Sequence, residues 1–327
     1  MIRPALVNSI FVLSLLASTQ ASAEGPRLDS REYKLMLEPT KFAGDQASKI
    51  VDRFWDEALK PIIARHLDAR DNGEPRSKKR FKLDKERVVL FRDTEACLLD
   101  RNSYALRERV ALKNGEEDKS TREVTLKFRT PDIFLAAATE LKGSSDEAST
   151  KLEEDISPLI VRARNPANNE TITLAQPRSM RSQFSVSTKQ RVGRDAPFDV
   201  LGDAMNAYPT LQDNLRKAGN SGLAMNSRLI RGIAIHELVF EGAEVDLGSD
   251  TDGEFALTLW YRQGGASSSK PLIAEISFKY DTNEGSVNAA VARRAQRLFE
   301  VMQDDLRGWS NPALGTKTSE ALPVACQ

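Results

Sequence analysis

Several segments of this chain alternate between apolar residues and charged or polar residues, and this period of two constrains the fold more than any other feature. Within Glu123–Arg129, Val124, Leu126 and Phe128 occupy one set of alternate positions, and charged or polar residues occupy the other. Glu32–Glu38 alternates in the same way. Because successive side chains of a strand point to opposite faces, each segment is predicted to be a β-strand with one apolar and one mostly charged face.

The same pattern brings two arginines close together. The segment Phe91–Val110 reads FRDTEACLLDRNSYALRERV, and its last part is predicted to be a strand with Arg107 and Arg109 on one face. Residues two positions apart along a strand are separated by about 7 Å. This spacing is suited to holding one polyanion between two guanidinium groups.

The charged faces of the predicted strands carry both signs of charge. Their basic side chains are Lys34, Arg107, Arg109, Lys127, Arg129, Lys189, Arg191, Arg262 and Lys279. Their acidic side chains are Glu32, Glu38, Glu123, Glu244, Asp246 and Glu275. These faces either line the lumen of a closed barrel or form the exterior of an ordinary antiparallel sheet, and alternation alone does not choose between the two. In a lumen, basic groups would neutralise phosphate oxygens and carboxylates would hold a bridging divalent cation.

Segments with helical periodicity accompany the strands. In Asp45–Leu67 apolar residues recur every three or four positions, which predicts an amphipathic helix kinked at Pro61. Ser286–Leu306 is predicted to be a second amphipathic helix. A short helix is predicted from Thr130 to Leu141, with proline at its first helical position.

The chain as a whole is electrically balanced, with 47 Lys+Arg and 47 Asp+Glu in 327 residues. Cationic surface binding to nucleic acid is therefore not expected, and any anion site must be built by segregating charge locally. Hydrophobic residues at 40% and charged residues at 29% are typical of an ordinary soluble globular protein.

The first residues have the composition of a secretory signal. Residues 1–23 contain Arg3, an apolar run over Ile10–Leu16, and the small residues Ala21-Ser22-Ala23 ahead of Glu24. The run is too short to span a bilayer, and an N-terminal core segment is the less favoured alternative. We expect cleavage near Glu24 and release into a bacterial periplasm, with no membrane anchor in the mature protein.

The mature chain is predicted to be one domain over residues 24–310, with a middle segment at about 143–227 that is the hardest to interpret and a C-terminal tail at 311–327. Its two cysteines are Cys97 and Cys326. A disulfide between them and a pair of unpaired thiols both remain open, because the sequence does not show that they meet. Neither has a Cys-x-x-Cys or Cys-His neighbourhood, so metal binding by sulfur is not predicted.

Several short segments of the chain, in the order in which they occur, resemble segments of one known family. Five segments of this chain are similar, in the same order, to segments of the CYTH superfamily, the triphosphate tunnel metalloenzymes. These segments are DT...LL...ALRERV, VTLKFR, KLEEDI, AEVDLG and AEISFKY. The resemblance covers most of the mature chain apart from the middle segment. It implies an α+β fold, a mainly antiparallel β-barrel or tunnel with flanking α-helices. It also implies a phosphorylated small-molecule polyanion as partner, with metal-assisted hydrolysis of tri- or polyphosphate.

The resemblance assigns roles to residues of this chain. Arg107, Arg109, Lys127 and Arg129 would clamp phosphoryl oxygens, and the other substrate-binding candidates are Lys34, Lys189, Arg262 and Lys279. The candidate ligands of Mg²⁺ or Mn²⁺ are Glu32, Glu275 and Asp246.

Two departures from the family pattern concern the metal site. The family's Glu-x-Glu-x-Lys reads Glu32, Lys34 and Met36 here, and Ser277 and Lys279 stand where members carry further carboxylates. Replacing acids by these residues removes ligands that divalent cations need. The chain is therefore either a metal-dependent phosphohydrolase or a non-catalytic module that binds a phosphate compound or a protein. A structural sheet protein without a ligand is a third possibility.

Other catalytic motifs do not fit the sequence. HELVF at His236 begins like a zinc-protease helix, but Phe240 stands at the second ligand position and the segment has the pattern of a strand. No Gly-rich phosphate loop and no nucleophile elbow are present.

Overall fold

The fold is known from a computed structural model that describes residues 25–164, 171–264, 269–283, 285–306, 308–311, 314 and 317–327, apart from the side chains of residues 171, 172 and 319. The predicted signal at 1–23 lies outside the described residues. Among the described helices, none has the length and apolar character needed to cross a membrane.

Nine strands close into a barrel, in the order β10-β3-β4-β6-β8-β7-β1-β13-β12, and β12 pairs with β10 to complete the ring. All neighbours are antiparallel except the parallel pair of β1 and β7. These strands are β1 (Ser30–Leu37), β3 (Lys82–Thr94), β4 (Tyr104–Lys113), β6 (Thr121–Thr130), β7 (Ser149–Arg164), β8 (Thr171–Gly193), β10 (Ile235–Glu241), β12 (Thr251–Arg262) and β13 (Ile273–Asp281). The short strands at the margins are β2 (Ser77–Lys78), β5 (Glu116–Glu117), β9 (Leu229–Arg231) and β11 (Glu244–Gly248).

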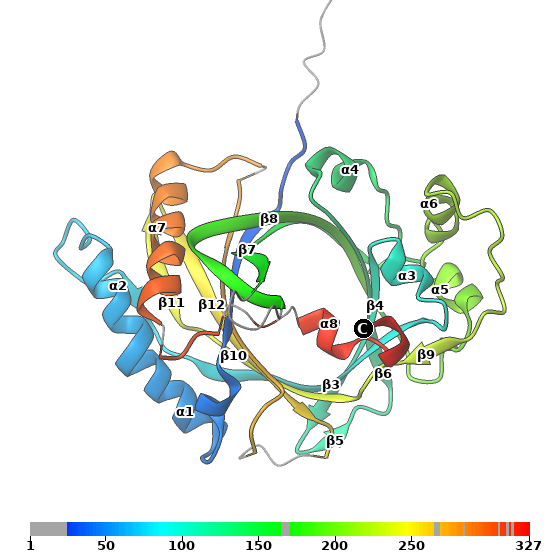
Figure 1. Cartoon of the computed structure of the whole chain (residues 1–327), viewed down its shortest axis with the longest axis horizontal. Coiled ribbons are helices and arrows are strands. Elements are labelled where there is room, and N and C mark those ends of the chain that lie inside the picture. Colours follow the sequence, from blue (N-terminus) through cyan, green and yellow to red (C-terminus); the bar gives the residue numbers. More distant parts are fainter. Residues whose placement is uncertain are drawn as a thin grey trace, which may run out of the picture.

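Helices cover the outside of the barrel on two sides (Figure 1). One group consists of α1 (Ala47–Phe54), η2 (Trp55–Leu59), α2 (Lys60–His66) and α7 (Ala289–Asp305). The other consists of α3 (Leu98–Arg101), α5 (Leu201–Ala207) and α6 (Leu211–Lys217). The remaining helical turns are η1 (Pro39–Phe42), α4 (Ile133–Ala138), α8 (Lys317–Ala321) and η3 (Val324–Cys326).

The apolar faces of the strands point outward and pack under these helices. On one side, Tyr33 of β1 stacks on Phe278 of β13 with ring centroids 4.7 Å apart, in a core that α1, α2 and α7 share. On the other side, Leu106 of β4 and Leu126 of β6 pack against α5 and α6. Because side chains alternate along a strand, burying these residues outside the barrel turns the charged residues into its lumen. The predicted fold class, a mainly antiparallel barrel with flanking helices, is confirmed.

The segment 143–227 supplies the two longest strands of the barrel. β7 and β8 pair over most of their length, and β8 also pairs with β6 while β7 pairs with β1. Without them the ring would stay open between β6 and β1. The part of the chain that was hardest to interpret thus completes the tunnel.

Two helices depart in detail from their predicted form. The helix predicted over 45–67 is interrupted by the π-helical turn η2 directly before Pro61. Proline has no N–H to donate to the preceding turn, so the backbone widens there instead of continuing as a regular α-helix. The predicted placement of Pro131 inside the first turn of α4 was wrong, because Asp132 is the N-cap and accepts from the backbone N–H of Phe134 at 2.8 Å.

A disulfide between Cys97 and Cys326 settles the question that the sequence left open, with the two Cα atoms 5.5 Å apart. It joins the start of α3 to η3 at the end of the chain. The described residues of the predicted tail include α8, which lies across one opening of the barrel in Figure 1.

Candidate functional site: a basic cavity in the barrel

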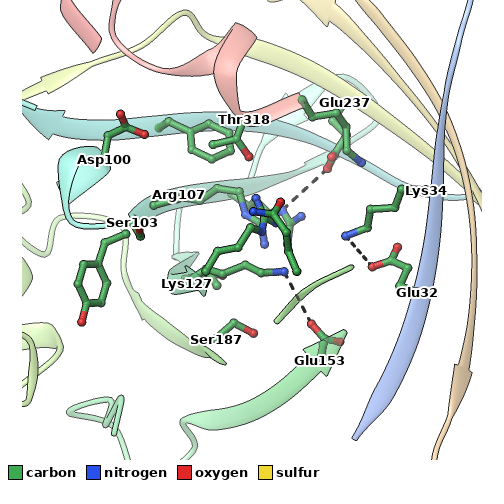
Figure 2. Close-up of a pocket in the computed structure, with 18 of the residues that line it drawn as sticks. Glu32, Lys34, Asp100, Ser103, Arg107, Lys127, Glu153, Ser187, Glu237 and Thr318 are labelled. Carbon is green, nitrogen blue, oxygen red and sulfur yellow. Dashed lines mark ion pairs between the residues drawn. The ribbon is translucent and has the colours of Figure 1, made fainter. Parts of the chain in front are cut away.

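The lumen contains a cavity of about 420 Å³. Its charged lining residues are Glu32, Lys34, Asp100, Arg107, Arg109, Lys127, Arg129, Glu153, Glu237 and Lys317. Figure 2 shows the side chains of Arg107 and Lys127 directed into a space that Glu237, Glu153, Lys34 and Glu32 surround. Side chains from strands far apart in the sequence therefore face one cavity.

Strand register sets the basic wall of this cavity. Arg107 of β4 lies opposite Thr125 of β6, and the next inward position of β6 is Lys127, opposite Ser187 of β8. These side chains alternate with outward apolar neighbours, so their inward direction follows from the same pleat that builds the outer core.

The Asp-Thr pair that precedes β4 fixes the turn leading into it. The buried Asp93 carboxylate accepts hydrogen bonds from the backbone N–H groups of Leu99 at 2.9 Å and Asp100 at 2.8 Å. The Thr94 hydroxyl accepts from the N–H of Leu98 at 2.9 Å. Burial raises the pKa of Asp93, although these N–H groups act in the opposite direction. This pair of residues positions the arginine strand and does not line the cavity.

Asp155 is the centre of an ion-pair cluster beside the cavity. Its carboxylate contacts Lys34 Nζ at 2.6 Å, Lys127 Nζ at 3.0 Å and Arg129 Nη2 at 2.9 Å. Burial opposes ionisation, but these three cations hold the pKa of Asp155 well below its usual range. Burial also works against the charge on Lys34, yet Asp155 and Glu32 together raise the pKa of Lys34 above its ordinary value.

Lys127 keeps its charge less firmly than Lys34. Burial lowers the pKa of Lys127 to about 8, against the attraction of Asp155 and with the help of the neighbouring positive charges of Arg129 and Lys34. An anion entering the cavity would add negative charge beside this ammonium group and favour its charged form.

Arg107 is the least satisfied cation of the site. Within the described part of the chain its guanidinium makes no ion pair, and its Nε is buried without a hydrogen-bond partner. Burial and the neighbouring charge of Arg109 lower the pKa of Arg107. The Nε of Arg109 and the hydroxyl of Thr125 are buried without a hydrogen-bond partner as well. Buried donors left unpaired cost free energy, so this wall of the cavity is built to receive acceptor atoms.

Glu237 is the most enclosed carboxylate of the cavity and is 2% exposed. It accepts from Trp260 Nε1 at 2.9 Å and forms an ion pair with Arg87. Burial opposes its ionisation, but Arg109, Arg87 and Lys317 together lower its pKa far below the ordinary value. It is thus a fixed negative charge at one side of the basic wall.

The three predicted metal ligands do not come together. Glu32 lines the cavity and pairs with Lys34 at 2.9 Å, and Glu275 pairs with Lys317 at 2.6 Å. Asp246 lies on β11 beyond the barrel ring, where Arg70 and two further basic residues hold it. Among the described residues, no group of three or more His, Cys, Asp or Glu side chains is arranged to hold a metal ion. The residues present therefore do not fit a resident Mg²⁺ or Mn²⁺.

Not all predicted substrate-binding residues reach the cavity. Lys34, Arg107, Arg109, Lys127 and Arg129 line it. The other three predicted cations do not: Lys189, Arg262 and Lys279. Lys189 has a 57% exposed side chain near Glu123, Arg262 is exposed at the end of β12, and Lys279 lies opposite Glu32 in the β1–β13 register.

Sequence reasoning missed Asp155, Glu237 and Lys317. Asp155 lies in the segment KLEEDI. The adjacent Glu154 obscured the alternation there, because it places a charge on the outward face, where it pairs with Arg31. Alternation along β10 could have identified Glu237. It shares the inward face of this strand with Ile235 and Val239. Lys317 had no periodic signal, because it enters the cavity from the C-terminal segment.

The chain was compared with known families and structures. No model of a known protein family matches it, and no curated protein matches it. A candidate adenylyl cyclase from Hippeastrum, described as having a dominant triphosphatase activity, aligns with 14% identity and a TM-score of 0.33, over 89% of this chain and 93% of its own. A candidate adenylate cyclase from Bacillus halodurans aligns with 11% identity and a TM-score of 0.36, over 90% of this chain and 98% of its own. The PH1819 protein from Pyrococcus horikoshii OT3 aligns with 8% identity and a TM-score of 0.26, over 84% and 90%. No family is assigned to the chain from these similarities.

Proposed function

We propose that this protein is an exported, divergent CYTH-like tunnel protein that binds a phosphorylated small-molecule polyanion, such as tripolyphosphate, inside its barrel. The Arg107 guanidinium, which forms no ion pair within the part of the chain that the structure describes, carries this proposal. Together with the Nε of Arg109 and the hydroxyl of Thr125, which make no hydrogen bond within the described residues, it presents buried donors to the cavity.

A phosphate chain suits these donors. Guanidinium groups bind phosphate oxygens through parallel hydrogen bonds, and Lys127 adds a compact charge at the neighbouring position of the wall. The cavity volume of about 420 Å³ lies within the range of roughly 300–1,000 Å³ that small-molecule sites occupy.

Binding without hydrolysis is the form of the proposal that the carboxylates support. Glu32 pairs with Lys34 through Oε2 and Glu275 pairs with Lys317 through Oε1, so an ammonium group already occupies one oxygen of each carboxylate where a divalent cation would need it. Metal-assisted phosphoryl transfer depends on cations that bridge the reacting oxygens. We therefore propose that the protein binds a phosphate compound without hydrolysing it. Detection of hydrolysis would overturn this part of the proposal.

The disulfide supports the proposed export. Disulfides persist in secreted and periplasmic proteins and are rare in reducing compartments, and Cys97 and Cys326 form one here. A mature N-terminus near Glu24, determined by N-terminal sequencing of protein from a periplasmic fraction, is the expected result. A cytoplasmic protein that keeps residues 1–23 would contradict the proposed localisation.

Isothermal titration calorimetry with tripolyphosphate in the presence of EDTA tests the binding proposal. The unchanged protein should bind, and Arg107→Gln should weaken binding about 10- to 100-fold, because a charge-assisted hydrogen bond contributes about 1.5–3 kcal/mol. Arg297→Gln removes the same charge from the exposed surface of α7 and should leave affinity unchanged. Equal effects of the two variants, or no heat of binding at all, would contradict the proposal.

Phosphate release from tripolyphosphate with added Mg²⁺ or Mn²⁺ separates binding from hydrolysis. We expect release no faster than in buffer with the metal alone. Release that depends on Arg107 would identify the protein as a phosphohydrolase.

A further inference from the structure

The C-terminal segment contributes a cation to the cavity. Lys317, the first residue of α8, lines the cavity, and its Nζ lies 2.6 Å from Glu275 Oε1. The same Nζ lies 5.8 Å from the centre of the Trp260 ring, close enough for a cation–π contact. Every other basic residue that lines the cavity belongs to a barrel strand.

Glu275 needs this partner because it is buried. Its side chain is 6% exposed, and no other basic residue forms an ion pair with it within the described part of the chain. A buried carboxylate without a counter-ion is strongly unfavourable. Lys317 thus supplies the positive charge that pairs directly with Glu275.

Three features hold Lys317 at this position. Ala321 and Leu322 are buried against Phe91 and Trp260 in an apolar cluster inside the barrel mouth. Gly232 lies directly under this turn, where an added Cβ would meet the Ala321 carbonyl oxygen at 1.9 Å. The disulfide fixes the end of the same segment to the barrel.

We propose that Lys317 is a tethered cation of the polyanion site, which keeps Glu275 neutralised and allows tripolyphosphate to bind without a divalent metal. This inference rests on the proposed function and adds a specificity-determining residue to it. Without Lys317, the net charge of the pair would change from zero to −1, and the Glu275 carboxylate would repel an anion in the lumen.

Calorimetry with tripolyphosphate in EDTA again provides the test. Lys317→Gln should weaken binding about tenfold, whereas Lys317→Arg should restore most of the affinity because it keeps the charge. Lys217→Gln removes an exposed lysine of α6 and serves as the matched control, for which no change is expected. The double variant Lys317→Gln/Glu275→Gln should recover part of the loss, since the uncompensated carboxylate is then absent.

The outcomes separate this inference from the proposed function. If Arg107→Gln weakens binding but Lys317→Gln leaves it unchanged, the tethered-cation inference is wrong and the polyanion site stands. If the unchanged protein does not bind tripolyphosphate, both are wrong. If the double variant recovers affinity, Lys317 acts by neutralising Glu275. A merely structural role of Lys317 would not produce this recovery, because a second substitution does not restore lost folding.

A measurement without ligand tests the position of Lys317. In the disulfide-bonded protein, Lys317 should react with an amine-acylating reagent at least about tenfold more slowly than Lys217, because its amine is held by Glu275 and partly buried. Mass spectrometry of the labelled peptides gives the two rates. Equal rates would show that Lys317 is not held in the lumen and would overturn the inference.

Discussion

At the scale of single residues, the partners of each charged group separate structural ion pairs from groups available to a ligand. Asp155 holds Lys34, Lys127 and Arg129 together, whereas Arg107 lines the cavity and forms no ion pair with any described residue. The sequence shows the same alternating basic pattern for all four cations and cannot separate them. The distinction depends on Asp155, which strand register places among three of them.

Removing the Asp155 carboxylate tests whether Lys34, Lys127 and Arg129 are held in structural ion pairs. Asp155→Asn leaves three cations with their mutual repulsion, so the free energy of unfolding should fall by about 3 kcal/mol. The same change frees these cations for an anion, so tripolyphosphate affinity should rise. Urea unfolding and calorimetry measure the two effects, and Asp281→Asn at the exposed end of β13 is the control. A fall in affinity would show that the cluster does not face the ligand.

The pH dependence of binding reports on Lys127. Its pKa of about 8 lies below the ordinary lysine value, and an anion binds the protonated form. The contribution of Lys127 to affinity should therefore be complete well below pH 8 and should decline as pH rises through this value. Lys127→Arg keeps its charge over this range, so the affinity ratio of the two proteins should change between about pH 7 and pH 9.5. A constant ratio would contradict a lowered pKa.

At the scale of secondary-structure elements, alternation predicted β1, β4 and β6 with the correct faces, because each carries regular apolar and polar positions. β7 was harder to interpret, since charged residues on both faces of Glu153–Asp155 obscure its period. The residues of the site were likewise predictable only where the strand pattern is regular. Arg107 and Lys127 were found from strand pattern, whereas Lys317 lies in a short turn whose position depends on packing and a distant disulfide.

The packing of α8 on Gly232 makes a prediction for this element. Gly232→Ala places a Cβ against the carbonyl of Ala321, so α8 must shift or leave. Thermal unfolding should show a loss of about 1–3 kcal/mol, as overpacking usually produces. Gly222→Ala adds the same methyl group where no atom lies within 4 Å and should have little effect. Equal melting temperatures for the two variants would show that the C-terminal segment is not seated there.

At the scale of the whole molecule, a chain with no net charge builds a basic cavity by sorting its charges. The 47 basic and 47 acidic residues cancel overall, but barrel closure brings Arg107, Arg109 and Lys127 to one wall. Composition could not predict this arrangement, because it depends on which strands become neighbours. Closure itself was an expectation from family resemblance, since alternation fits an open sheet equally well.

The disulfide adds stability to the whole barrel. Cys97 and Cys326 are 229 residues apart, so their bond restricts most of the unfolded chain. Cys97→Ser/Cys326→Ser should lower the free energy of unfolding by about 3–5 kcal/mol, measured by urea unfolding under non-reducing conditions. A change of less than 1 kcal/mol, within about the error of such extrapolations, would show that the segment contributes little to the fold.

A crystal structure of the protein with tripolyphosphate, grown in the presence of EDTA, tests the central claim most directly. Phosphoryl oxygens should lie within hydrogen-bond distance of Arg107, Arg109 and Lys127, with Lys317 still on Glu275 and no divalent cation bridging the ligand. A polyanion bound outside the barrel, or a metal ion held by Glu275 with Lys317 displaced, would contradict it.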